Sequence, residues 1–194
     1  MAAWMERLRR LLSRFAAARE AVAAIEFALV LPIMLLVYIG GVEASSLISM
    51  DRRVQTITGS LGDLVARSDG KIVSATLQNY FKAAEGIMLP FSTAPLVQVV
   101  TSVQVMADGT TKVVWSRQYA TNTMSSTGKA RTVGQPYPLP VEITNISRSS
   151  YVIVSETYYS FSPVSNFVYK ANIPLYRENF HVPRFGAEIK LDPP

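Results

Sequence analysis

Residues 21–43 read AVAAIEFALVLPIMLLVYIGGVE, and this stretch decides the architecture that we expect. Between Val22 and Val42 it contains one residue that is charged at neutral pH, Glu26. A helix of about 20 mostly apolar residues crosses a bilayer core of roughly 30 Å. Its strongly apolar residues should favour insertion by about 5 kcal/mol, whereas one acidic residue costs about 3 kcal/mol at mid-span and less near an end. We therefore predict a transmembrane helix over residues 22–42.

A secretory signal peptide is the alternative interpretation of the same stretch. Residues 27–39 have the length of a signal-peptide core, and Val42, Glu43 and Ala44 match a small-x-small cleavage site. Two features favour the membrane span: a long segment precedes the apolar run, and Glu26 interrupts its start. Cleavage after Ala44, which would release a secreted protein, stays the weaker alternative.

The segment before the span is basic and amphipathic. In residues 1–20 the apolar side chains fall on one helical face with arginines opposite, which is typical of a helix on an anionic membrane surface; these are Trp4, Leu8, Leu11, Leu12 and Phe15. Arginines before an apolar span also indicate that the N-terminus is cytoplasmic and that everything after Glu43 lies outside. The remaining charge of a chain with net +5 is scattered, so we expect no nucleic-acid partner.

A second pattern follows the span directly. Apolar residues recur at intervals of three and four, at Leu47, Met50, Val54, Ile57, Leu61 and Leu64. Such a narrow seam predicts a helix that packs along one side, against another helix or against its own domain, and we assign it to contact with a partner helix. Span and extension together predict one helix over residues 22–66, roughly 65 Å long.

The rest of the chain predicts a small α+β domain. A helix should begin with Ser74 as N-cap and run past Ala84 until Gly86 or Pro90 ends it. Period-two alternation then predicts a hairpin of residues 97–105 and 112–115 around Asp108-Gly109. Further along we expect a loop over residues 119–140, an interior strand over 151–161, and one or two strands mixed with loop over 164–191.

The predicted fold class is therefore α+β: one long N-terminal membrane-spanning helix, a second helix and a small antiparallel sheet. The predicted organisation has four parts: a basic leader (1–21), a transmembrane helix (22–42), a helical extension (43–67) and an outer head (68–194).

The order of residues around the span resembles the class III prepilin-like start of TadE-like pseudopilins from the tight-adherence (Flp) pilus system. The shared parts are Arg19, the small Ala21, the apolar residues 22–25, the string EFALVLP of residues 26–32, and the GGVE close of residues 40–43. The VVWS and YSFSP strings of the head, at residues 113–116 and 159–163, also resemble that family.

This resemblance implies that a prepilin peptidase cuts between Ala21 and Val22, with Glu26 and Phe27 completing the processing site. Glu26 would then be the fifth residue of the mature chain. The family usually has Gly before the cut where this chain has Ala21. The implied partners are other pilin-like subunits or pilus assembly proteins, in addition to membrane lipid.

The residues offer little for catalysis. The chain has one histidine, His181, and no cysteine, so neither a metal site nor a thiolate nucleophile is expected. Two Ser-x-x-Lys strings, starting at Ser68 and Ser126, lie in Gly-containing turns without the companion motifs of acyl-serine enzymes. We expect no cofactor, no small-molecule substrate and no enzymatic activity.

The function that the sequence favours is that of a non-enzymatic pseudopilin or pilus assembly component, anchored in the bacterial inner membrane. Two alternatives stay open. A generic membrane-tethered periplasmic binding protein would keep the span without any link to pili, and a small periplasmic enzyme would need a catalytic pocket in the head.

Overall fold

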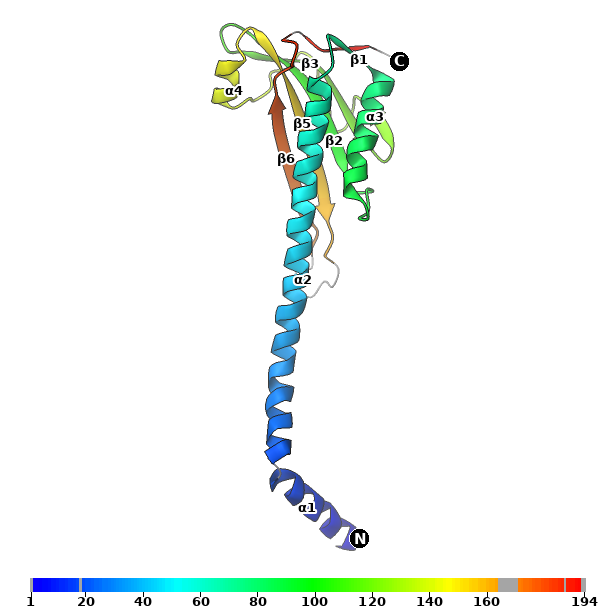
Figure 1. Ribbon diagram of the computed structural model, residues 1–194, viewed down its shortest axis with the longest axis vertical. Helices are drawn as coiled ribbons and strands as arrows, with labels where there is room; N and C mark the ends of the chain where they lie inside the picture. Colours follow the sequence, from blue (N-terminus) through cyan, green and yellow to red (C-terminus); the bar gives the residue numbers. More distant parts are fainter. Residues whose placement is uncertain (1, 18, 164–170, 187, 193–194) are drawn as a thin grey trace.

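The computed structural model describes residues 2–17, 19–163, 171–186 and 188–192 (Figure 1). One long helix forms the spine of an elongated molecule. A short helix lies at the N-terminal end of this spine, and a compact α+β head is built around its other end. This arrangement confirms the predicted fold class.

The spine is α2 (Arg19–Ala66), which continues through Pro32 without interruption. It follows α1 (Ala2–Ala17), the predicted amphipathic segment. Among the described residues, α2 is the one helix long and apolar enough to cross a membrane, from Val22 onward. A single helix therefore contains both the predicted span and the predicted extension.

The head contains an antiparallel five-stranded sheet in the order β4-β3-β2-β5-β6. The hairpin predicted around Asp108-Gly109 is present, and the strand predicted near residues 151–161 is an interior one, between β2 and β6. The strands are β2 (Val97–Val105), β3 (Thr111–Ala120), β4 (Thr123–Ser125), β5 (Ser150–Phe161) and β6 (Ile173–His181).

The two faces of this sheet are covered differently. The C-terminal half of α2 and the antiparallel α3 (Ser74–Glu85), which continues into the turn η1 (Gly86–Met88), lie on one face (Figure 1). The main hydrophobic core lies between them and the sheet. On the other face, the segment that leads to the short α4 (Val141–Ile146) covers a smaller core around Val103, Val152 and Val154.

A small parallel sheet of β1 (Lys71–Val73) and β7 (Lys190–Asp192) ties the end of the described chain to the start of the head. Neither β1 nor its pairing with β7 was predicted, because three-residue strands carry no periodic signal. The pairing also corrects the predicted cap of α3. Val73 occupies the N-cap position, and the hydroxyl of Ser74 donates a hydrogen bond to the Asp192 carbonyl at 2.9 Å instead.

Two other predictions need correction or completion. The loop expected over residues 119–140 is wrong at its start, where β3 extends to Ala120 and β4 follows. The strands expected within residues 164–191 are found as β6 and β7, whereas residues 164–170 and 187 lie outside the described part of the chain.

Candidate functional site

The N-terminal half of α2 presents apolar side chains on all sides. Phe27, Ile33 and Tyr38 are 61%, 62% and 70% exposed, and their apolar neighbours are similarly uncovered. A soluble monomer rarely leaves such an extended apolar surface in water. In a bilayer the same surface is in contact with lipid, and every backbone group is satisfied within the helix.

Glu26 lies within this apolar surface. Its side chain is exposed, and the residues one helical turn away on the same side include Val22, Leu29 and Val30, which are also exposed. None of the ion pairs formed among the described residues includes Glu26. A carboxylate inside a lipid-facing helix is costly unless it pairs with a partner, which makes Glu26 the leading functional candidate of the span.

The residues of the expected processing site lie in helical backbone near the start of α2. Val22 is 50% exposed and Phe27 is 61% exposed, whereas the side chain of Ala21 is outside the described part of the chain. The bond between Ala21 and Val22 thus lies within the first turn of α2. Cleavage at this bond stays a prediction.

The apolar seam of the second half of α2 faces the chain's own sheet. Met50, Val54, Ile57 and Leu61 are at most 1% exposed and belong to the main core of the head. Leu47 packs against that core, and Leu64 is half-buried. Of the two alternatives for the seam, the structure therefore shows contact with the chain's own domain, and these core side chains are not exposed to a partner helix.

Gly62 lets α2 approach the sheet closely. A β-carbon added to Gly62 would lie 2.6 Å from the Ser155 hydroxyl oxygen and would also overlap the ring of His181. At this close approach the Ser155 hydroxyl donates a hydrogen bond to the Thr58 carbonyl, at 2.8 Å. The sheet side of α2 is therefore matched to the head by shape as well as by hydrophobicity.

Arginines fix α2 to the head at its margins. Arg177 of β6 pairs with Asp51 at 2.5 Å, and Arg184 pairs with Asp63 at 2.6 Å. Hydrogen bonds from Arg67 and Arg184 hold the pKa of the Asp63 carboxyl below its ordinary value. On the other side of the helix, Arg53 donates hydrogen bonds to the carbonyl oxygens of Ile87 and Leu89, at 2.6 and 2.9 Å.

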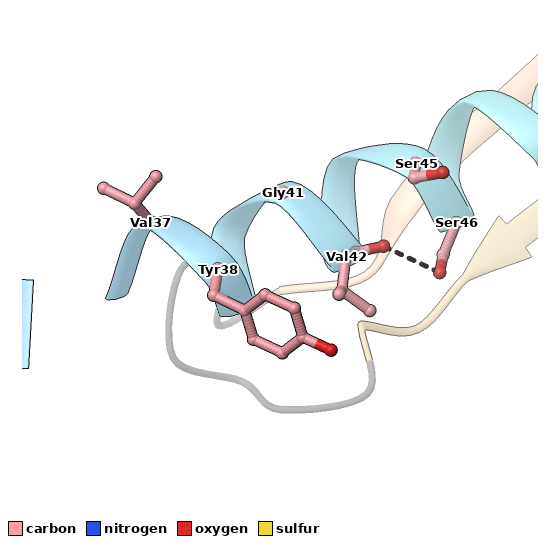
Figure 2. A pocket seen from close by; sticks show the side chains of 6 residues that line it. All are labelled: Val37, Tyr38, Gly41, Val42, Ser45 and Ser46. Atoms are coloured by element: carbon pink, nitrogen blue, oxygen red, sulfur yellow. Dashed lines mark hydrogen bonds between the residues drawn. The ribbon is translucent and has the colours of Figure 1, made fainter. Parts of the chain in front are cut away.

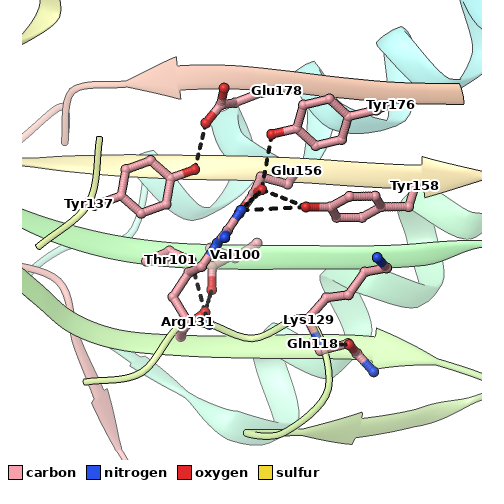
Figure 3. Close-up of polar contacts among 11 residues, drawn as sticks. Val100, Thr101, Gln118, Lys129, Arg131, Tyr137, Glu156, Tyr158, Tyr176 and Glu178 are labelled. Atoms are coloured by element: carbon pink, nitrogen blue, oxygen red, sulfur yellow. Dashed lines mark hydrogen bonds and ion pairs between the residues drawn. The ribbon is translucent and has the colours of Figure 1, made fainter. Parts of the chain in front are cut away.

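The strongest electrostatic feature of the head is on the opposite face of the sheet and was not predicted (Figure 3). The carboxylate of Glu156 is inaccessible to solvent and forms an ion pair with Arg131. Arg131 belongs to residues 126–140, the covering loop, which lie between β4 and α4 over this face of the sheet. It also accepts hydrogen bonds from the hydroxyl groups of Tyr158 at 2.8 Å and Tyr176 at 3.0 Å. Burial, together with the hydrogen bond to Glu156, raises the pKa of Tyr158 to about 12.

This cluster holds the covering loop onto the sheet. Tyr137, also from that loop, donates a hydrogen bond from its hydroxyl group to Glu178 at 2.5 Å (Figure 3). The charge of Glu156 is thus satisfied inside the molecule. No local sequence signal could reveal the cluster, since its members come from a loop and two strands that only the sheet brings together.

A shallow groove marks the place where the exposed part of α2 meets the head (Figure 2). Its described lining residues are Val37, Tyr38, Gly41, Val42, Ser45 and Ser46, and none of these six carries a carboxylate, amine or imidazole. The Ser46 hydroxyl donates to the Val42 carbonyl within the helix, at 2.9 Å. Glu43, on an adjacent side of α2, is only 4% exposed, and it is the first buried residue of α2 after the predicted span among those described.

His181, the last residue of β6, packs against α2 beside Gly62. Burial lowers the pKa of its imidazole below the ordinary value of 6.5, while the neighbouring Asp63 opposes that shift. Among the described residues, no group of three or more acidic, histidine or cysteine side chains is placed to hold a metal ion.

Comparison with known proteins found a family match for the segment that contains the predicted span. The sequence model of the TadE-like protein family matches residues 21–58. Comparisons with curated proteins and with solved structures found no match.

The resemblance of the N-terminal region to TadE-like proteins is thereby confirmed over residues 21–58. The matched segment begins at the predicted processing site and ends inside the head-bound half of α2. The resemblance of the VVWS and YSFSP strings lies outside the match and stays a prediction.

Proposed function

We propose that this protein is a membrane-anchored, non-enzymatic component of a tight-adherence pilus, acting by helix–helix association in the bacterial inner membrane. The observation that carries the proposal is the coincidence of the TadE-like match with the lipid-exposed half of α2 that contains Glu26. The five-residue distance from Ala21 to Glu26 supports the pseudopilin interpretation, as does the apolar surface around the carboxylate.

The proposed orientation places α1 in the cytoplasm and the head in the periplasm. Arginines in α1 support this orientation through the positive-inside rule. The head then stands on the periplasmic surface of the inner membrane, and it is joined to the span without a flexible linker because α2 is continuous.

In the proposed mechanism Glu26 pairs with a positive group on a neighbouring pilin-like helix. If a prepilin peptidase cuts before Val22, the new α-amino group of a neighbouring subunit is the natural partner. Removing one partner of a charge pair in a low-dielectric setting costs several kcal/mol, so such a pair fixes the relative height of the two helices.

The test is Glu26→Ala in cells that assemble the pilus, with Glu6→Ala in α1 as the matched control. We expect Glu26→Ala to insert normally into the membrane but to reduce piliation, or co-purification of pilin-like partners, by at least about tenfold, the factor that corresponds to about 1.4 kcal/mol. Piliation equal to that of Glu6→Ala would overturn the proposed mechanism.

The N-terminus of the protein isolated from its native membrane distinguishes the alternatives. A start at Val22 supports a processed pseudopilin, and a start at Ser45 supports secretion. A start at Met1 or Ala2 supports a plain membrane anchor.

A further inference from the structure

Helix α1 has an apolar face that no other described part of the molecule covers. Its apolar side chains are between 45% and 73% exposed, and they are Trp4, Met5, Leu8, Leu11 and Leu12. At about 100° per residue these five side chains fall within an arc of about 120°. A face of this width matches the contact stripe of an amphipathic helix.

The charged residues of α1 are placed around this face. Arg7 and Arg9 flank the apolar arc on its two sides, and Arg10 lies opposite it. Flanking arginines of this kind let the apolar side chains enter the acyl region while each guanidinium extends to the headgroups.

The position of α1 in the molecule identifies the surface that it meets. It ends at Ala17, only five residues before Val22, where the lipid-exposed stretch of α2 begins. The axis of α1 is inclined to that of α2, so α1 departs sideways from the end of the span (Figure 1). A helix attached in this way stays at the membrane boundary.

We propose that α1 is an interfacial helix that lies on the inner-leaflet surface and binds anionic phospholipid through Arg7 and Arg9, with Trp4, Leu8 and Leu11 in the acyl region. This role belongs to the chain before any removal of residues 1–21, and it does not depend on a link to pili. It gives the protein a second membrane attachment beside its span.

The experiment uses Trp4 as a depth probe in the full chain, reconstituted into vesicles that contain brominated phosphatidylcholine. The other tryptophan, Trp115, is buried in the head, so a Trp4→Phe variant supplies its signal for subtraction. Vesicles of phosphatidylcholine alone are compared with vesicles containing roughly one quarter phosphatidylglycerol. The mass of the intact protein verifies that residues 1–21 are present.

We expect bromine to quench Trp4 at least about twofold more strongly in the anionic vesicles, with a blue-shifted emission. The double substitution R7Q/R9Q should reduce quenching to the level in phosphatidylcholine alone, whereas R7K/R9K should retain it. Water-like, unquenched Trp4 emission in both vesicles would overturn the proposal. Equal quenching in both would overturn the part assigned to anionic lipid, and a blue shift without bromine quenching would indicate contact with protein instead.

Discussion

The two halves of α2 have the same backbone and opposite environments. In the first half Leu29, Ile33 and Val37 are 62–70% exposed, whereas in the second half Val54, Ile57 and Leu61 are fully buried. The first half is apolar all round, and the second is apolar along one stripe with polar residues elsewhere. A helix that is apolar on every side suits lipid, and a striped one suits a protein surface. The change occurs near Glu43, without a break in the helix.

The difference shows that the continuity of a helix does not imply one kind of contact along its length. The seam at residues 47–64 packs against the head, so the apolar surface of α2 that the described residues leave uncovered is mainly that of the first half. This restriction makes Glu26 more informative, because it is the one side chain between Val22 and Val42 that is charged at neutral pH. Leucine and glycine positions can be matched between the two halves of α2, and the other two predictions concern charged and titratable groups of the head.

The largest effect is expected from truncating a seam residue. Leu61→Ala should lower the free energy of unfolding of the head by about 2–5 kcal/mol, because it leaves a cavity in the core. The matched Leu36→Ala, in the exposed half, should leave the stability of the head unchanged. Urea unfolding in detergent, followed by Trp115 fluorescence in a Trp4→Phe background, measures both. Equal losses would contradict the division of α2 into two environments.

The next largest effect is expected from removing the partner of the buried carboxylate Glu156, compared with a change at the exposed carboxylate Glu26. Arg131→Ala should destabilise the head by about 2–3 kcal/mol, because it leaves Glu156 charged and buried with only two tyrosine hydroxyl groups. Glu26→Gln should leave the head as stable as the wild type, since Glu26 lies in the span. The same urea titration measures both variants. Wild-type stability of Arg131→Ala would show that the Arg131–Glu156 pair does not hold the covering loop.

Alanine substitution of Gly62, with Gly41 as the control, tests the close approach of α2 to the sheet. Gly62→Ala should cost about 1–3 kcal/mol, because its β-carbon would overlap His181 and Ser155. Gly41→Ala, whose β-carbon would meet nothing within 4 Å, should stay within about 1 kcal/mol of the wild type and gain helix propensity. Thermal unfolding of the two variants in parallel gives the comparison. A tolerated Gly62→Ala would mean that the helix can move away from the sheet at no cost.

The smallest expected effect is a dependence of the head's free energy of unfolding on pH. The folded pKa of His181 lies below 6.5, so the unfolded chain binds more protons between that pKa and 6.5. Stability should therefore fall as the pH decreases through 6.5, and this loss should end below the folded pKa. His181→Gln should remove this part of the pH profile, with Asp63 and Arg184 still present. An unchanged profile in that variant would assign the dependence to another group.

Much of the fold could be predicted because its signals are local. The apolar run predicts the span, the intervals of three and four predict the buried side of residues 47–64, and the alternation after Val97 predicts the hairpin. These patterns record which faces are apolar, and burial follows from them. They do not record what covers the face, and for this reason contact with a partner helix could not be distinguished from contact with the head.

The features that could not be predicted depend on residues far apart in the chain. The pairing of β1 with β7 joins residues 71–73 to 190–192, and three-residue strands have no detectable period. The Glu156 cluster combines a loop arginine with tyrosines on two strands, and its existence depends on the register of β5 and β6. Side-chain chemistry of this kind becomes visible only once the strand order is known.

We infer that the first half of α2 crosses the membrane and that the second half belongs to a head outside the cytoplasm. Single-cysteine labelling is the most direct test of this inference. The natural chain has no cysteine, so Arg9→Cys, Val30→Cys and Gln55→Cys can each be probed with a membrane-impermeant maleimide. In intact spheroplasts we expect Gln55→Cys to be labelled and Val30→Cys to stay unlabelled. Arg9→Cys should be labelled only after permeabilisation. Labelling of Val30→Cys in intact spheroplasts, or a protein released from the membrane, would contradict it.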